Sequence, residues 1–194
     1  MTHMTNARIA GIAYLFYIVV GASNEILASR AASVEGTAAK LAHIAAYSTD
    51  VRVGMILKLC ECFSAFVLAV ALYWITRDVN RELAMLGLIC RVAEGVFIVS
   101  LIPNALGFLS LARAQAVKGA ADVTTTNALG IFLTRPDGLI GAIFFAIGSA
   151  IFSYLLLRGR MIPISLGWWG VLSSVLLVVG LPLQIASFFT GPLT

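Results

Sequence analysis

The sequence predicts an all-α integral membrane protein, built as a helical bundle of about five transmembrane helices with short interfacial helices in the outer connections. Hydrophobic residues make up 60% of the chain and charged residues 11%, whereas a soluble domain has roughly 45–50% apolar and about 25% charged residues. The apolar residues fall in long runs, and about 20 such residues cross a hydrocarbon core of about 30 Å. Five spans and their links use all 194 residues, so we expect a single domain, residues 1–194.

The first two spans are separated by a polar connection. The run 8–28 predicts the first span and the run 51–76 the second. Between them, the segment 29–50 is polar, and its apolar residues recur at helical spacing. One face of this short helix carries Leu41, Ile44, Ala45 and Ser48. We therefore expect a helix lying at the membrane surface.

The second and third spans are joined by the tight polar turn 77–82. The third span covers 83–112, and Pro103 predicts a kink because proline lacks the amide hydrogen that a helix interior needs. The segment 113–137 is a second polar connection, with a further interfacial helix expected around 127–133.

The last two spans are predicted at 138–157 and 164–189, joined by the short link 158–163. Trp168 and Trp169 stand near the start of the final span. Tryptophan is enriched at membrane–water interfaces, so this pair predicts one edge of the bilayer.

Basic residues are denser in the short links than in the long connections, which predicts a cytoplasmic location for the short links. The N-terminus is then cytoplasmic and the C-terminus outside. The basic residues that carry this prediction are Arg8, Arg77, Arg81, Arg158 and Arg160.

Five ionisable residues fall inside the apolar runs and form the predicted ligand- or proton-binding site: Glu25, Lys58, Glu61, Arg91 and Glu94. A charge near the bilayer centre costs roughly 2.5–3.5 kcal/mol, so these side chains should face the bundle interior and one another. Lys58 and Glu61 are three residues apart, as are Arg91 and Glu94, a spacing that places each pair on one helix face. Depth counting from the turn places Glu61 and Glu94 within about 5 Å of one level.

Three carboxylates face two cations in this group, so one carboxylate lacks a full partner. That carboxylate could bind a proton, a cation or an amine. The competing interpretation is structural: the two pairs neutralise each other and fix the helix register. A third interpretation, catalysis by the cluster, would need an acid, a base or a nucleophile open to a lipid or quinone.

Other chemistries find little support in the sequence. His3 and His43 lie outside the spans, so two histidines cannot hold a haem between helices. We expect no cofactor, no metal site and no catalytic residue, because no zinc-protease helix, phosphate loop or nucleophile elbow is present. The net charge of +4 is scattered, which argues against nucleic-acid binding.

Three stretches of the chain resemble a bacterial multi-pass membrane family known as a domain of unknown function, DUF4386. They are Arg8-Ile9-Ala10-Gly11, the stretch from Ala71-Leu72-Tyr73 through Arg77, Val79, Asn80 and Arg81 to Arg91, and Gly138 through Leu157 with Arg158 and Pro163. The resemblance covers most of the chain. It implies a polytopic protein of a bacterial inner membrane and carries no established activity.

The sequence therefore favours a non-enzymatic protein that binds or transports a small solute, a proton or a lipid at its intramembrane charges. The expected partners are membrane lipid, a small-molecule ligand and a second copy in a homodimer. The alternatives are a non-catalytic accessory or scaffold subunit and a membrane enzyme acting on a lipid or quinone.

Overall fold

The computed structural model describes residues 3–32, 37–116 and 138–185, and every element in this part of the chain is a helix. The predicted all-α bundle is confirmed. Within these described residues, five helical stretches are long and apolar enough to cross a membrane: Met4–Arg30, Ser48–Thr76, Arg81–Arg113, Gly138–Arg158 and Ile164–Gln184. In chain order the helices are α1 (His3–Ala32), α2 (Thr37–Ala46), α3 (Ser48–Thr76), α4 (Arg81–Ser100), α5 (Ile102–Ala116), α7 (Gly138–Arg158) and α8 (Ile164–Ile185).

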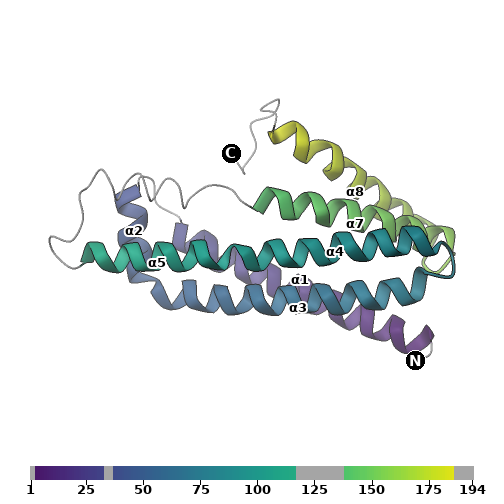
Figure 1. The fold of residues 1–194 in the computed structure, drawn as a ribbon, viewed down its shortest axis with the longest axis horizontal. Coiled ribbons are helices and arrows are strands. Elements are labelled where there is room, and N and C mark those ends of the chain that lie inside the picture. The colour runs from purple at the N-terminus through teal and green to yellow at the C-terminus, as the bar shows by residue number, and fades with distance from the viewer. Residues whose placement is uncertain (1–2, 33–36, 117–137, 186–194) are drawn as a thin grey trace.

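The short helix expected between the first two spans is present as α2, which lies across one end of the bundle (Figure 1). The second interfacial helix, expected around 127–133, lies outside the described residues. The turn between α3 and α4 is tighter than predicted, because α4 already begins at Arg81. The Asn80 side chain sets this start by accepting a 2.9 Å hydrogen bond from the amide of Leu83, which satisfies one free donor of the first turn.

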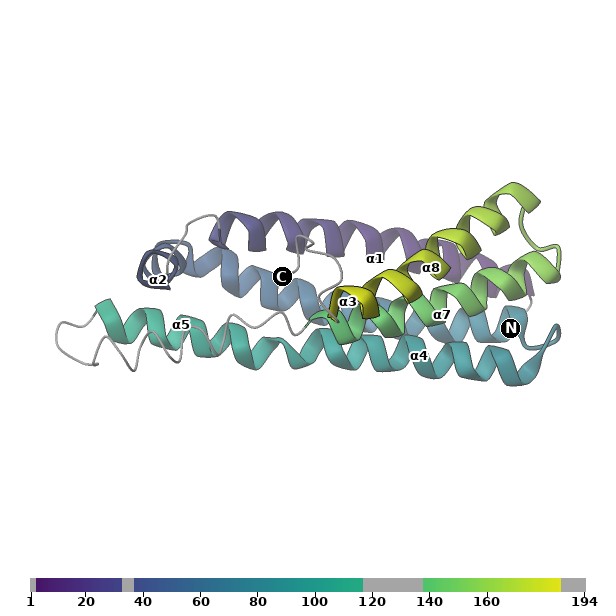
Figure 2. The ribbon, with the colours of Figure 1, turned by 90° about the horizontal axis from the view of Figure 1, so that it is seen from above.

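The sequence predicts a kink at Pro103, and the structure has an interruption of the third span at Leu101, between α4 and α5. Pro103 has no amide hydrogen to donate back to Val99, so the regular ladder cannot continue through it. The Leu101 amide instead makes a 3.4 Å hydrogen bond to the carbonyl of Ile98. The two helices nevertheless continue in nearly one direction, so the span is interrupted rather than sharply bent (Figure 2).

The helices pack in a simple order. α1 packs along α3, α3 along α4, α4 along α7, and α7 along α8. The helix α8 packs on α7 and on no other described helix, and it splays away from the rest (Figures 1 and 2). The N-terminus and the two short links lie at one end of the bundle, whereas α2 and α5 lie at the other (Figure 1). The structure thus groups the arginine-rich links as the sequence predicts.

Glycines allow the helices of the bundle to approach closely. A Cβ atom at Gly87 would lie 3.1 Å from the Phe152 ring, and one at Gly148 would lie 3.1 Å from the Arg91 side chain. Lipid tails are as apolar as leucine, so close packing rather than hydrophobic burial holds membrane helices together. The α4–α7 contact therefore depends on these two glycines.

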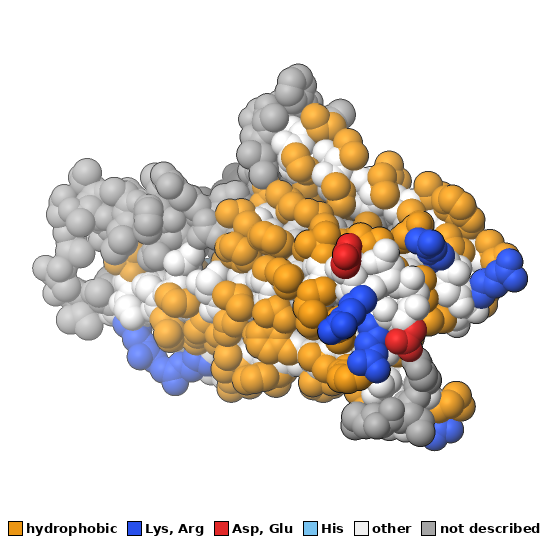
Figure 3. Space-filling model, turned by 45° about the vertical axis from the view of Figure 1, so that its right-hand side comes forward, with side chains coloured by type: hydrophobic (Ala, Val, Ile, Leu, Met, Phe, Trp, Pro, Cys, Tyr) orange, Lys and Arg blue, Asp and Glu red, His pale blue; other side chains and the backbone are white. Residues whose placement is uncertain are grey.

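Apolar side chains cover most of the described surface on the face shown in Figure 3, as a lipid-facing surface requires. The charged side chains on the face shown collect toward its ends, mainly over the short links. Trp168 and Trp169 are 54% and 77% exposed at the same end of the bundle, in the first turns of α8. This arrangement fits the interfacial role predicted for the two tryptophans.

Candidate functional site

The centre of the site is a buried ion pair on α4. Arg91 and Glu94 are each only 2% exposed, and Arg91 Nη1 lies 2.6 Å from Glu94 Oε2. The spacing of three residues brings both side chains to the same helix face, as the sequence predicts. An isolated charge at this depth would be costly, and each member of the pair relieves that cost for the other.

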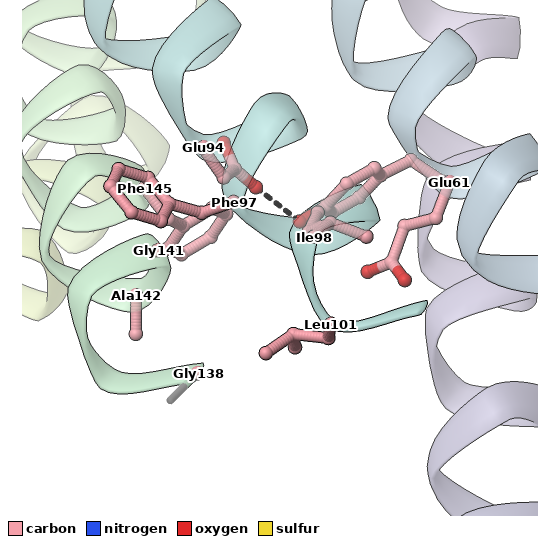
Figure 4. A pocket seen from close by; sticks show the side chains of 10 residues that line it. Glu61, Glu94, Phe97, Ile98, Leu101, Gly138, Gly141, Ala142 and Phe145 are labelled. Atoms are coloured by element: carbon pink, nitrogen blue, oxygen red, sulfur yellow. Dashed lines mark hydrogen bonds between the residues drawn. The ribbon is translucent and has the colours of Figure 1, made fainter. Parts of the chain in front are cut away.

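A tyrosine from α1 completes the arrangement around Glu94. The Tyr17 hydroxyl donates a 2.5 Å hydrogen bond to Glu94 Oε1, drawn as the dashed line in Figure 4. The Arg91 guanidinium is flanked by two nearly parallel rings, with its central carbon 5.1 Å from the Tyr17 centroid and 5.0 Å from that of Phe145. Both oxygens of Glu94 are thus engaged, one by a cation and one by a hydroxyl.

The guanidinium group is nevertheless undersatisfied. Its contact with Glu94 is short, but the N–H directions do not meet the oxygen, and none of its three nitrogens donates a hydrogen bond to a described residue. Buried polar groups almost always have hydrogen-bond partners, and here the guanidinium is stabilised by its ion pair with Glu94 and by the two flanking rings.

Glu61 approaches the same place from α3. It is half-buried, and its Oε1 atom would lie 3.1 Å from a Cβ atom at Gly21 of α1, so the glycine leaves room for the carboxylate. In Figure 4 the Glu61 side chain points into the space between α3 and α4, across from Glu94. The structure therefore brings Glu61 and Glu94 to one cavity, in agreement with the depth expected from the sequence.

The predicted Lys58–Glu61 ion pair does not form. No Lys58 nitrogen lies within 4.0 Å of a Glu61 oxygen, although the structure describes both residues. Lys58 Nζ instead lies 3.3 Å from the side-chain oxygen of Asn24, when the amide is oriented so that its nitrogen donates to the Gly54 carbonyl at 3.2 Å. The Asn24 amide on α1 thus competes with the Glu61 carboxylate, one turn along α3, for the Lys58 ammonium.

Glu25 lies apart from this group. It is exposed on α1, whereas Asn24 beside it is buried at 7% exposure. At about 100° per residue, Tyr17, Gly21 and Asn24 fall within about 60° of one another on α1, and Glu25 falls at the edge of that face. Glu25 is one of the five predicted site residues, but it makes no hydrogen bond or ion pair with Glu61 or Glu94 in the described structure.

The residues around Glu61 and Glu94 line a partly open cavity of about 250 Å³, called here the central cavity. It lies between α1, α3, α4 and the first turns of α7, beside the interruption at Leu101 (Figure 4). Its polar side chains come from three helices, and the remainder of the wall is apolar. The lining residues are Tyr17, Glu61, Glu94, Phe97, Ile98, Leu101, Gly138, Gly141, Ala142 and Phe145.

Sequence reasoning did not single out Tyr17. A signal was present, because Tyr17, Gly21 and Asn24 recur at the four- and three-residue spacing of a single helix face. A hydroxyl within an apolar run, on the face that carries the only amide of that run, should be expected to point at a polar partner.

Comparison with known proteins gives a family and no activity. No curated protein and no solved structure matches the chain. The family described as a domain of unknown function, DUF4386, matches residues 9–192, nearly the whole chain. The sequence resemblance is thereby confirmed, and this five-span membrane protein belongs to the DUF4386 family.

Proposed function

We propose that the protein binds, and in the course of its function transports, a small positively charged solute or a proton in the central cavity. One observation carries the proposal: a cavity between the helices has a carboxylate, Glu61, with no cationic side chain of the described residues within 4.0 Å. The adjacent Glu94 is already matched by Arg91. The formal charge of the three groups is therefore −1, which favours a cation or proton as the occupant.

The surroundings of Glu61 support this proposal electrostatically. Apolar walls lower the local dielectric, so the attraction between Glu61 and a cation is far stronger than in water. Lys58 is the nearest competing cation along α3, but its ammonium is held by Asn24. An occupant of the cavity would therefore supply the positive charge that the fold does not.

Native mass spectrometry of the detergent-purified protein, with release and identification of bound molecules, tests the proposal. We expect a bound species in the wild type and its loss in Glu61→Gln. The matched control is Glu82→Gln, which neutralises an exposed glutamate in the first turn of α4, far from the cavity. A bound species retained in Glu61→Gln, or a wild type with no bound species and no proton uptake, refutes the proposal.

The proposal includes a bacterial inner membrane location with a cytoplasmic N-terminus and an external C-terminus. The exposed arginines of the short links, gathered at one end of the bundle, support this orientation. The central cavity then opens nearer the outer leaflet, because it adjoins the start of α7. A C-terminal alkaline phosphatase fusion should be active and a C-terminal green fluorescent protein fusion dark.

Transport also bears on the oligomeric state. Five spans are few for alternating access built on inverted repeats, so we include a homodimer in the proposal. The mass of the intact complex in the same native spectrum tests this point. A strictly monomeric species would contradict the homodimer and would leave the proposed binding unaffected.

A further inference from the structure

We propose that the ligand of the central cavity is a protonated amine carried on a compact apolar body, such as an aromatic ring with a short alkyl chain. This inference rests on the proposed function and narrows it to one chemical class. The ammonium would lie against Glu61, and the body would lie among the apolar side chains of α4 and α7.

The walls of the cavity define the apolar part of the ligand. Phe97, Ile98, Leu101 and Phe145 are the large apolar side chains of the wall. Ligand sites commonly combine such walls with a few polar groups that fix orientation. A small inorganic cation would leave this apolar surface unused, whereas a hydrocarbon body would fill it.

The volume sets the size of the body. An apolar cavity of about 150 Å³ is large enough to hold benzene. The central cavity, at about 250 Å³, therefore has room for a benzene ring with a short chain ending in an ammonium group. The Tyr17 and Phe145 rings, 6.5 Å apart and within 7° of parallel, already flank the Arg91 guanidinium, so the body of the ligand would lie beside them, against Phe97, Ile98 and Leu101.

The polar groups exclude the other ligand classes. Calcium takes about 6–8 oxygen ligands and magnesium near-octahedral coordination, whereas Glu61 is the one carboxylate here whose oxygens are not already engaged by Arg91 and Tyr17. An anion would meet the uncompensated charge of Glu61. A fatty acyl chain would desolvate that carboxylate without compensating it.

The charged groups near Glu61 agree with a single ammonium. On its own helix, Lys58 points to Asn24. On α4, Arg91 is paired with Glu94, and on α1 the exposed Glu25 carries a negative charge and so supplies no cation. None of these groups supplies the missing positive charge at Glu61, and one ammonium group would.

Three probes with one skeleton test the inference: 3-phenylpropylamine, 3-phenylpropan-1-ol and 3-phenylpropanoate. Binding is measured by isothermal titration to the full-length protein in nanodiscs of phosphatidylcholine and phosphatidylglycerol, which contain no primary amine. We expect saturable binding of the amine alone. Glu61→Gln should weaken amine binding about 10- to 100-fold, as loss of a charge-assisted contact predicts, and Glu82→Gln should leave it unchanged.

The outcomes separate this inference from the proposed function. Equal binding of the amine and the alcohol, or unchanged amine affinity in Glu61→Gln, overturns the amine assignment. If native mass spectrometry releases a bound cation of another chemical class, and that cation is lost in Glu61→Gln, the amine assignment is overturned and the proposed function stands. If Glu61→Gln fails to fold, Glu61→Asp provides the second test, because it retains the charge and should retain selectivity for the amine over the alcohol.

Discussion

The Tyr17 hydroxyl and Glu94 Oε1 are joined by a 2.5 Å hydrogen bond across 77 positions of sequence, between two helices that do not pack directly against each other. The helix α1 reaches α4 through this side-chain bridge at the wall of the central cavity. Removing the hydroxyl would therefore uncouple the two helices without disturbing a helix–helix interface. The bridge also holds Glu94 in place opposite Glu61.

Replacing Tyr17 with Phe should lower the free energy of unfolding by about 1.5–3 kcal/mol, the range for a hydrogen bond to a charged group. Unfolding can be followed by tryptophan fluorescence during titration of the detergent-solubilised protein with sodium dodecyl sulfate. Tyr14→Phe is the matched control, because Tyr14 is 50% exposed on the same helix, and its effect should stay within about 0.5 kcal/mol. Equal effects of the two replacements would contradict a bridging role for Tyr17.

Replacing Arg91 with Met should destabilise the protein by about 3–5 kcal/mol, because Glu94 is left as an uncompensated buried charge. The double replacement Arg91→Met with Glu94→Gln should recover most of that loss, since no net charge remains buried. The comparison uses the same unfolding titration. A double variant as unstable as the sum of the two single variants would show that the two side chains act independently.

Replacing Gly95 with Ala should destabilise the bundle by about 1–3 kcal/mol, the usual cost of overpacking. A Cβ atom there would lie 2.6 Å from Cε1 of Phe66, whose ring is held edge-on by Phe63. Gly11→Ala is the matched control: no atom lies within 4 Å of its Cβ position, so it should gain up to about 1 kcal/mol of helix propensity. The thermal melting midpoint should fall in Gly95→Ala and rise in Gly11→Ala, and this difference would verify the close packing at Gly95.

Replacing Arg160 with Gly should raise the free energy of unfolding by about 0.5–1 kcal/mol. Arg160 adopts a φ of 52°, a left-handed conformation that costs side chains and suits glycine. It ends α7 in a Schellman-type turn, in which the Met161 amide donates to the Leu156 carbonyl at 3.0 Å. Arg158→Gly is the control: it lies inside the last turn of α7 and should destabilise the protein instead. A loss of stability in Arg160→Gly would contradict a strained backbone at Arg160.

The spans and their order could be predicted because a membrane imposes long apolar runs. The buried Arg91–Glu94 pair could be predicted as well, since three-residue spacing and the cost of isolated charge both favour it. The interruption near Pro103 followed from the missing amide hydrogen. These features depend on local sequence and on the solvent.

The features that the sequence did not reveal depend on neighbouring helices. Lys58 has the spacing to pair with Glu61, but the amide of Asn24 on α1 takes its ammonium. Glu25 counts as an intramembrane charge by position, yet α1 turns it away from the group that Tyr17 joins. Which partner a side chain chooses is decided by helix rotation, and periodicity alone does not give the rotation of one helix relative to another.

The short turn between α3 and α4 makes these two helices a helical hairpin, with Glu61 on one helix and Glu94 on the other. Glu94 lies 13 residues beyond Arg81, about 20 Å from the turn at 1.5 Å per residue. A change of about 6° in the angle between α3 and α4 would therefore shift one carboxylate relative to the other by about 2 Å. Because Tyr17 ties Glu94 to α1, and α1 packs along α3, this hydrogen bond opposes an increase in the angle between α3 and α4.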